Sequence, residues 1–383
     1  MAPPHRGLPD EIAIWEILIR LDPKALLRCR AVCRAWLRAT STREFLVIHH
    51  GRQPTLPLLD GYNGDVDDRT LDIIPLDHRA RLVAADQLQP IARLDHRHPL
   101  QSCDGLLLLC TNGTDISNGG ADIKRQYSIC NPATRQYAPL PQIADFIVVA
   151  MYPHGHTGEY RLLLYPGRLM NGKLAPGLHD GFYVFTLGSC QPPRHIGWPE
   201  AKEVMFEKNV LFRGNLHWYM EVLESSKAGM ILVFDTTAES FKEMRAAPID
   251  CGDADLFEMD GMLILAKFNN AAEAIDIWIL QDYEREIWIC KCQIRLPAED
   301  IRAQFQEVHR NWDVQVTSSD EAVIILVLYG LYRILQIDID GKLVATFHRE
   351  GLCRGLLRLK QSLVPHTFFP ALEGYVANSL PFM

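Results

Sequence analysis

The chain after residue 50 repeats one arrangement of short apolar segments and turns. Runs of Val, Ile, Leu, Tyr and Trp alternate with Gly, Pro, Asn and Asp, which is typical of β-strands joined by tight turns. Turn dipeptides recur at Asp104-Gly105, Asp180-Gly181, Asp260-Gly261 and Asp340-Gly341, with a further turn at Arg213-Gly214-Asn215. Apolar runs follow several of them. This recurrence predicts a series of similar small β-sheets.

The repeated unit has three parts. A strand follows the turn, a second strand ends at a polar corner, and a third strand carries an aromatic residue and often closes on Pro. The clearest copies cover residues 106–141, 210–248, 256–297 and 314–347; residues 145–199 form a less regular copy, and residues 56–98 are expected to share one more with the tail 363–382. Sheets of three or four strands that cannot bury both faces alone are typical of propeller blades. We therefore predict an all-β propeller-like domain of about six blades over residues 51–383.

A single β-sandwich is the alternative for this region. About 330 residues with more than twenty expected strands are too many for one sandwich. No clean WD-repeat or kelch signature accompanies the repeat, so the prediction rests on the number and spacing of the strands. A short surface helix is expected within the β region, over residues 300–309, because Pro297 precedes a helical pattern.

Residues 8–45 have a helical pattern instead. Pro9 suits the first turn of a helix, whose positive end Asp10 and Glu11 complement, and Asp22-Pro23 is a good N-cap and first residue for a second helix. Apolar residues recur at helical spacing along three segments: Ile12, Trp15, Leu18, Ile19 and Leu21; Leu26 and Leu27; and Val32, Cys33, Trp36 and Leu37. Three short helices are too small to bury this much apolar surface alone, so a partner is expected to cover it.

These residues match a known family pattern in order. The matching positions are Leu8-Pro9, Glu16-Ile17-Leu18, Arg20-Leu21, Val32-Cys33-Arg34-Ala35-Trp36 and finally Phe45, which is expected to anchor the chain where it leaves the helices. The segment resembles an F-box. One departure is Asp22, where many members have Pro; Pro23 moves the rigid residue by one position and keeps the helix start. We expect a three-helix F-box over residues 1–50, and the chain as a whole to be α+β.

The F-box resemblance implies a partner, the Skp-type adaptor of cullin-based ubiquitin ligases. Eight residues are the candidates for adaptor binding: Leu8, Pro9, Ile12, Ile17, Leu18, Leu26, Val32 and Trp36. They are expected to divide between the adaptor interface and a small internal core, and the sequence does not say which residue does which. The alternative is an ordinary three-helix cap packed on the β domain.

A second resemblance lies in the β region. The stretches that carry it are Ser102-Cys103-Asp104-Gly105-Leu106-Leu107, Asn131-Pro132-Ala133-Thr134, Phe212-Arg213-Gly214-Asn215-Leu216-His217-Trp218 and Phe234 to Phe241. Together they resemble the F-box-associated domain of plant F-box proteins, in particular the lineage-expanded class of grasses. The resemblance implies that the β domain recruits target proteins.

Charge and cysteine usage narrow the function classes. The net charge is −8, and it is uneven: residues 1–50 hold 8 Lys and Arg against 5 Asp and Glu, whereas the rest holds 31 against 42. An acidic chain is a poor candidate for nucleic-acid binding. A basic head fits an acidic partner, although Arg28, Arg30, Arg34 and Arg38 can equally be solvated. Ten scattered cysteines without a CxxC pair indicate a reduced, intracellular protein, cytoplasmic or nuclear, and we expect no membrane span.

Catalytic motifs are not evident in the sequence. GxSxG, HExxH and the phosphate-loop glycine pattern are all missing. The histidine pairs His49/His50, His96/His98 and His154/His156 have no obvious third ligand, so we expect no metal, no cofactor and no enzymatic activity. His217 is expected to hydrogen-bond a turn, Trp218 to pack between blades, and Asp235-Thr236-Thr237 to form a turn that caps backbone groups.

The leading hypothesis is a substrate-recognition subunit of a Skp-cullin-F-box ubiquitin ligase. The head would hold the adaptor, and the β domain would present a target whose identity the sequence does not give. Loops at residues 111–124 and 169–181 are expected contact surfaces, because loops on rigid scaffolds commonly carry specificity. Two alternatives remain: a propeller interaction scaffold not engaged with a ubiquitin ligase, and a propeller enzyme with a site in its central channel.

Overall fold

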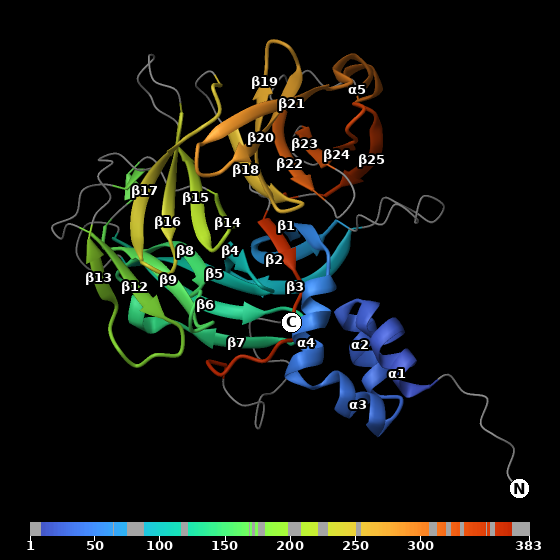
Figure 1. Cartoon of the computed structure of the whole chain (residues 1–383), viewed down its shortest axis with the longest axis vertical. Helices are drawn as coiled ribbons and strands as arrows, with labels where there is room; N and C mark the ends of the chain where they lie inside the picture. The colour runs from blue at the N-terminus through green and yellow to red at the C-terminus, as the bar shows by residue number, and fades with distance from the viewer. Residues whose placement is uncertain are drawn as a thin grey trace, which may run out of the picture.

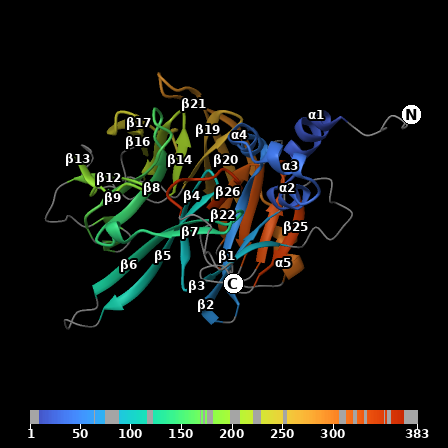
Figure 2. The ribbon, with the colours of Figure 1, turned by 90° about the horizontal axis from the view of Figure 1, so that it is seen from below.

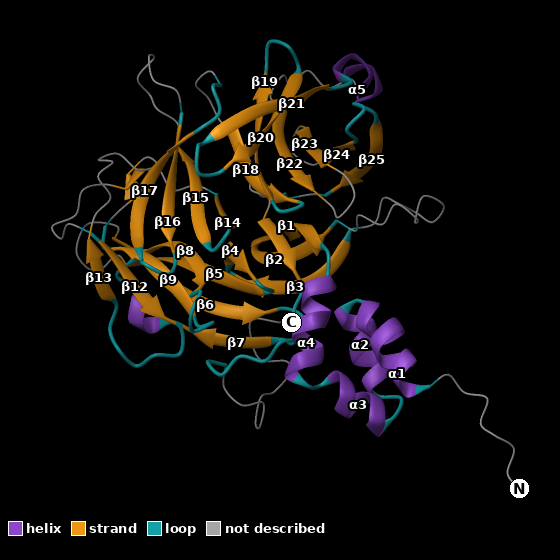
Figure 3. Cartoon of the chain, viewed as in Figure 1, coloured by secondary structure: helices purple, strands orange, loops and turns teal. Residues whose placement is uncertain are grey.

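The helices of residues 10–52 gather at one end of the molecule, and strands form most of the rest (Figures 1 and 3). The computed structural model describes residues 9–63, 65–74, 88–115, 122–167, 169–170, 173–174, 181–197, 208–220, 229–249, 254–305, 312–318, 323–329, 333–349, 351–352 and 357–369. No helix among these residues is long and apolar enough to cross a membrane. The predicted α+β chain, with N-terminal helices followed by a β-propeller of six blades, is confirmed.

Six four-stranded antiparallel sheets form the blades. Blade 1 is β26 (Leu357–Lys360), β1 (Thr55–Asn63), β2 (Asp65–Ile73) and β3 (Gln89–Asp95). Blade 2 is β4 (His98–Cys103), β5 (Leu106–Asp115), β6 (Asp122–Asn131) and β7 (Gln136–Pro139). Blade 3 is β8 (Ile147–Pro153), β9 (Tyr160–Tyr165), β12 (Phe182–Thr186) and β13 (Arg194–Gly197), with a small hairpin of β10 (Leu169–Met170) and β11 (Lys173–Leu174) between β9 and β12.

The other three blades each use four consecutive strands. Blade 4 is β14 (Asn209–Phe212), β15 (Asn215–Met220), β16 (Met230–Asp235) and β17 (Ser240–Arg245). Blade 5 is β18 (Ala254–Met259), β19 (Met262–Asn269), β20 (Ala274–Asp282) and β21 (Ile287–Arg295). Blade 6 is β22 (Trp312–Ser318), β23 (Val323–Tyr329), β24 (Arg333–Ile337) and β25 (Leu343–His348). The first strands of several neighbouring blades contact one another, so they line the centre of the ring.

Blade 1 joins the two ends of the β domain. β26 pairs antiparallel with β1, with Thr55 opposite Lys360 and Leu58 opposite Leu357. The sequence predicted a blade shared by the first strands and the tail, and this sharing is observed. The strand that closes the ring lies at Leu357–Lys360, however, a few residues before the predicted tail, and residues 370–382 of that tail lie outside the described part of the chain.

Apolar side chains fill the spaces between blades on both faces of the inner strands. In β5, Leu106 and Leu108 pack in the cluster shared by blades 2 and 3, whereas Leu107 and Leu109 pack in the cluster shared by blades 1 and 2. Alternate residues of a strand point to opposite faces, so a strand between two blades needs apolar residues at every position. This requirement explains the continuous run of four leucines.

Two kinds of turn recur between the strands at one face of the ring. Where the first strand of a blade turns into the second, Asp104-Gly105, Arg213-Gly214 and Asp260-Gly261 all have positive φ at both positions, as two-residue hairpins of type I′ require. The predicted polar corner lies where the third strand turns into the fourth, at Asn131, Asp235, Asp282 and Asp338, whose side chains accept backbone N–H groups two to four residues on. In an antiparallel meander these two kinds of turn lie on the same face of the ring.

The head consists of a helical segment followed by three further helices. The segment comprises α1 (Asp10–Ile12), η1 (Ala13–Ile17) and η2 (Leu18–Arg20), and α2 (Pro23–Arg30), α3 (Arg34–Thr40) and α4 (Arg43–Arg52) follow. As predicted, the Asp22 carboxylate accepts the Ala25 N–H at 3.0 Å and Pro23 is the first residue of α2. Phe45 lies within α4, whose N-terminus is capped by Thr42, so it packs from a fourth helix instead of from the chain leaving the helices.

Within the β domain, α5 (Ala298–Phe305) lies between blades 5 and 6 along the chain. It begins directly after Pro297, as expected, and Glu299 and Asp300 occupy its first turn. Residues 306–309 of the predicted helix lie outside the described residues.

Removal of the Leu359 side chain is expected to destabilise the whole ring. Leu359 is 1% exposed and packs from the closing strand into the cluster shared by blades 1 and 2. We expect Leu359→Ala to lower the free energy of unfolding by about 2–5 kcal/mol, measured by urea denaturation. The control is Val344→Ala in β25, where the side chain is 37% exposed and the change should stay within about 0.5 kcal/mol. Equal losses in the two variants would contradict this role of β26.

Candidate functional site

The surface of the head carries most of the exposed apolar side chains of the described chain. Thirteen large apolar residues are exposed among the described residues, and eight of them lie between residues 12 and 48: Ile12, Trp15, Ile17, Leu27, Val32, Leu37, Val47 and Ile48. Val32 is 67% exposed, the largest fraction in this set. Concentrated exposed apolar surface marks interaction sites in soluble proteins. The head is therefore the part of the chain where a protein partner is expected to bind.

Burial separates the eight sequence-derived candidates into two groups. Pro9, Ile12, Ile17 and Val32 are exposed, whereas Leu18 and Leu26 are 3% and 0% exposed and belong to the internal core of the head. Trp36 is half-buried against the same core, and Leu8 lies outside the described residues. Leu18 and Leu26 thus hold the head together, and only the exposed members are placed to meet a partner.

Five exposed residues were missed as interface candidates: Trp15, Leu27, Leu37, Val47 and Ile48. Their signal in the sequence is that apolar residues occupy more positions than the buried face of each helix needs. In α4, for example, Val47 and Ile48 are exposed although they sit between the buried Leu46 and His49. Periodicity alone does not show which of two adjacent apolar residues faces inward.

The core of the head includes residues from the far end of the chain. Leu363 and Val364, which follow the closing strand, pack with Phe45 and Leu26 of the head, and Ala133 from the turn between β6 and β7 joins them. Phe45 and Leu26 are both fully buried. The head is therefore packed on the ring through the segment after β26.

Polar contacts fix the end of α4 to blade 2. The His50 Nδ1–H donates to the Gln361 carbonyl at 3.0 Å, and His50 Nε2 lies 3.6 Å from a carboxylate oxygen of Asp104. The other oxygen of Asp104 accepts the Tyr160 hydroxyl at 2.9 Å. Burial alone would raise the pKa of Asp104, but the hydrogen bonds from His50 and Tyr160 outweigh it and leave this pKa below its usual value. Asp104 is thus held ionised where the head meets the ring.

Two of the stretches that resemble the F-box-associated domain hold this joint. The Asn131 amide, which is fully buried, donates to the Ser362 carbonyl at 3.0 Å. Gly105 lies so close to Ser362 that a Cβ at this position would be 2.5 Å from the Ser362 Cβ. Both turns therefore position the segment after β26, and through it the head.

Members of two of the three histidine pairs make hydrogen-bond contacts within the protein. His49 Nε2 lies 2.8 Å from the Leu21 carbonyl, and His154 Nδ1 lies 3.1 Å from the Thr157 hydroxyl. Among the described residues there is no group of three or more His, Cys, Asp or Glu that could hold a metal ion.

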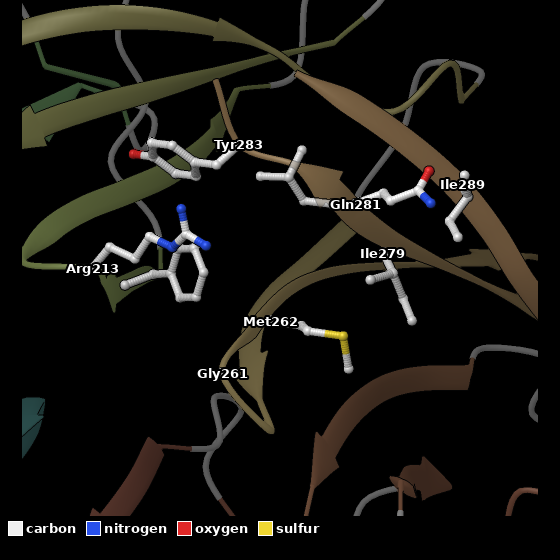
Figure 4. A pocket seen from close by; sticks show the side chains of 9 residues that line it. Arg213, Gly261, Met262, Ile279, Gln281, Tyr283 and Ile289 are labelled. Carbon is white, nitrogen blue, oxygen red and sulfur yellow. The ribbon is translucent and has the colours of Figure 1, made fainter. Parts of the chain in front are cut away.

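A pocket of about 270 Å³ opens where blade 4 meets blade 5 (Figure 4). Arg213 and Tyr283 lie on one side of it, and Met262, Ile279 and Ile289 lie on the other. Arg213 is in the first turn of blade 4, and Tyr283 is in the turn between β20 and β21 of blade 5. The volume is enough for one large side chain of a bound peptide.

A buried histidine fixes one wall of the pocket. The Tyr283 hydroxyl donates to His217 Nε2 at 2.9 Å, and His217 Nδ1–H donates to the Asn215 carbonyl at 3.1 Å. His217 is fully buried, and burial lowers its pKa to about 4, so the imidazole is neutral and can accept this bond. The prediction that His217 hydrogen-bonds a turn is confirmed, and so is the packing of Trp218, which is fully buried between blades 3 and 4.

The predicted turn at Asp235 also has its expected role. The Asp235 carboxylate accepts the backbone N–H groups of Thr237 and Ala238, both at 2.8 Å, and the Thr236 hydroxyl donates to the Gly214 carbonyl at 2.5 Å. Glu239, at the end of this turn, binds Arg161 and Arg194 of blade 3. The turn is structural and ties blade 4 to blade 3.

Head and ring together define a class: a six-bladed β-propeller protein with an F-box at its N-terminus. The F-box-like family model matches residues 6–47, and the model of the F-box associated beta propeller domain matches residues 77–351, well over half of the chain. The chain belongs to the family of plant F-box proteins with an F-box associated β-propeller domain. Families of this type are generally not enzymes.

Similar proteins come from Arabidopsis thaliana. F-box protein At5g49610 is 24% identical over 73% of this chain and 77% of its own length, and putative F-box protein At1g30920 is 22% identical over 90% and 87%. Among solved structures, TolB from Acinetobacter baumannii is 11% identical, covers 80% of this chain and 67% of its own, and has a TM-score of 0.46.

Acidification is expected to destabilise the fold through buried histidines. Burial lowers the pKa of both His217 and His366 to about 4, whereas histidine titrates near 6.5 in an unfolded chain. The unfolded state binds more protons between these values, so the free energy of unfolding is highest above about pH 6.5 and falls as the pH drops toward 4. The fully buried His217 accounts for up to about 3 kcal/mol of this loss.

Urea denaturation between pH 7.5 and pH 4.5 measures this dependence. His217→Gln should be less stable than the wild type at pH 7.5 and show a flatter decline, because it removes one group that gains a proton on unfolding. His156→Gln, which changes an exposed histidine, should keep the wild-type slope. A His217→Gln variant with an unchanged slope would refute the assignment.

Substitution of Gly105 tests the joint between head and ring. Gly105→Ala places a Cβ against Ser362 at a residue with φ of 86°, whereas Gly214→Ala, the equivalent turn position of blade 4 with φ of 73°, meets no atom within 4 Å. The backbone strain, about 1 kcal/mol, should be common to both variants. We expect the additional clash in Gly105→Ala to increase amide hydrogen exchange in α4, and Gly214→Ala to leave it unchanged. Equal exchange in the two variants would mean that Gly105 does not position the head.

Proposed function

We propose that this chain is the substrate-recognition subunit of a Skp-cullin-F-box ubiquitin ligase. The observation that carries the proposal is the concentration of exposed apolar side chains on the F-box, where Ile12, Ile17 and Val32 are open to a partner. Covering such a surface stabilises a complex by about 25 cal/mol per Å² of apolar area before the costs of association. In this proposal the head, residues 1–50, binds the Skp-type adaptor, and the β domain, residues 51–383, binds a target protein.

Charge supports the same division. Residues 1–50 carry a net +3 and the rest of the chain a net −11. A head with a net positive charge favours an acidic partner, since complementary charge speeds association and excludes other partners. The proposed adaptor would therefore meet the head through an apolar contact with an acidic rim.

In the proposed complex this chain binds and positions, and the transfer of ubiquitin belongs to a conjugating partner. Holding a target lysine near the activated donor raises the rate by proximity. Such an effect needs a head that keeps a fixed orientation to the ring. The contacts of His50, Asp104 and Leu363 at the joint support this requirement. The proposal places the protein in the cytoplasm, the nucleus or both.

An interaction scaffold that is not engaged with a ubiquitin ligase is the second candidate. The observation that favours it is the packing of the head on the ring, since Leu363, Val364 and Ala133 contribute to the core of the head. A cap that only shields the end of the propeller would make the same contacts. The two candidates differ in what covers the exposed apolar residues of the head.

Charged substitutions on the head separate the two candidates. The double variant Ile17→Asp/Val32→Asp changes residues that are 49% and 67% exposed, so the fold should be preserved. We expect it to weaken binding of a purified Skp-type adaptor at least 100-fold, because both carboxylates would be buried against apolar surface. Binding is measured by calorimetry, and the melting temperature checks the fold.

The matched control is Ile339→Asp, which changes an apolar side chain of 48% exposure in the turn between β24 and β25. It should bind the adaptor like the wild type. If the wild type does not bind the adaptor, or if the head variant binds as tightly as the control, the ligase proposal is rejected in favour of the scaffold.

A further inference from the structure

We propose that the pocket between blades 4 and 5 binds an extended segment of a target protein, one apolar side chain of which enters the pocket while a neighbouring Asp or Glu side chain binds Arg213 and Lys242. This inference rests on the proposed function, because it names the site and the chemistry by which the β domain would take its target. It assigns no role to the head.

The walls of the pocket are suited to one apolar side chain. Phe212, Met262, Ile279, Leu280 and Ile289 line it, and its volume is about 270 Å³. That volume lies just below the range of drug-sized ligand sites, so it suits a single large residue better than a cofactor. Ile289 is 43% exposed at its edge and belongs to β21, the outermost strand of blade 5. An extended segment can therefore run past the opening.

Two cations beside the pocket have no carboxylate partner among the described residues. The Arg213 guanidinium carbon lies 5.4 Å from the centre of the Phe212 ring and 5.3 Å from that of Tyr283, and Lys242 Nζ lies 5.5 Å from the Tyr283 ring centre. Neither side chain makes a hydrogen bond or ion pair with another described residue, and both are exposed. These cation–π contacts place the Arg213 guanidinium near two rings, which accept no hydrogen bond from it in the described structure, so its N–H groups are available to a carboxylate.

Three acidic residues of the adjacent turns are already engaged. Asp235 accepts two backbone N–H groups of its own turn, and Asp282 does the same in the turn of Tyr283. Glu286 binds the Arg245 side chain at 3.0 Å. In a β domain with a net charge of −11, a pair of cations left without such partners favours an acidic ligand.

The site is also rigid before any ligand arrives. Tyr283, whose ring both cations contact, is held by its hydrogen bond to the fully buried His217. Arg213 occupies a two-residue turn with φ of 49°, a conformation fixed by the hairpin of β14 and β15. A preorganised site binds more tightly because less side-chain entropy is lost on association.

Binding of defined peptides to the purified full-length chain tests the proposal. The probe is a library of twelve-residue peptides with Leu, Phe or Trp at the centre and Glu, Gln or Lys at each of the four flanking positions. We expect the chain to select peptides with Glu one or two residues from the apolar centre over the Gln and Lys versions. Affinity should fall as salt is raised, since the charges lie at the surface.

Matched variants locate the site. Asparagine tolerates the positive φ of this position, so Arg213→Asn should preserve the turn. We expect it to weaken binding of the selected peptide about tenfold, because one charge-assisted hydrogen bond is lost. Its control is Arg245→Asn, which removes a cation that already pairs with Glu286. Ile289→Ser should also weaken binding about tenfold, whereas Ile287→Ser, equally exposed on the same strand but not lining the pocket, should change it less than twofold. The double variant Arg213→Asp/Lys242→Glu reverses both charges, so it should bind the Lys peptides in preference to the Glu peptides.

The proposal is overturned if no library peptide binds, if Glu is not preferred over Gln, or if the pocket variants match their controls. Calorimetry with the Skp-type adaptor keeps this outcome separate from the proposed function, because Arg213→Asn and Ile289→Ser should bind the adaptor like the wild type. Peptide selection in a chain that fails to bind the adaptor would reject the ligase proposal and leave the pocket as the binding site of a scaffold.

Discussion

The pairing of β26 with β1 is the interaction on which the rest of the structure depends. It supplies the first strand of blade 1 and so joins the two ends of the β domain. The chain then continues directly into Leu363 and Val364, which pack in the core of the head. Lys360, the last residue of β26, donates to the Gly51 carbonyl at the end of α4. The same segment therefore closes the ring and positions the head. Figure 2 shows α4 beside β26.

The same short turn serves different purposes around the ring, depending on what lies against it. In the Asp104-Gly105 turn, the Asp104 carboxylate binds Tyr160 and His50, and the lack of a Cβ at Gly105 lets Ser362 pack against the turn. This turn therefore helps to hold the head. At Asp260-Gly261 no atom lies near the Gly261 Cβ position, and the turn instead lines the pocket. A repeated β architecture thus allows one blade to be used for attachment and another for binding without any change in the turn itself.

Sequence patterns predicted the repeating parts of this fold and failed where distant segments meet. The strands, the polar corners and the cap at Asp22 are set by neighbours in sequence, so their signals are local. The closing strand Leu357–Lys360 has only four residues, two of them charged, and gives no such signal. Ile17 and Leu18 are equally apolar neighbours, and packing in the head core, which also includes Leu363, decides which one is buried. The pocket draws on three turns and four strands, which no single motif marks.

The connectivity of the blades places the attachment of the head and the pocket on one face of the ring. Asp104 and Ala133, which meet the head, lie in the first and last turns of blade 2, and Arg213 and Tyr283 lie in the corresponding turns of blades 4 and 5. Blade 2 and the boundary between blades 4 and 5 are two and a half blades apart in a ring of six, almost opposite each other. The head therefore does not cover the pocket. In the proposed complex, a target segment held there would lie on the face of the ring to which the head is attached. The adaptor would bind the head, so the joint at Asp104 would set the distance between adaptor and target.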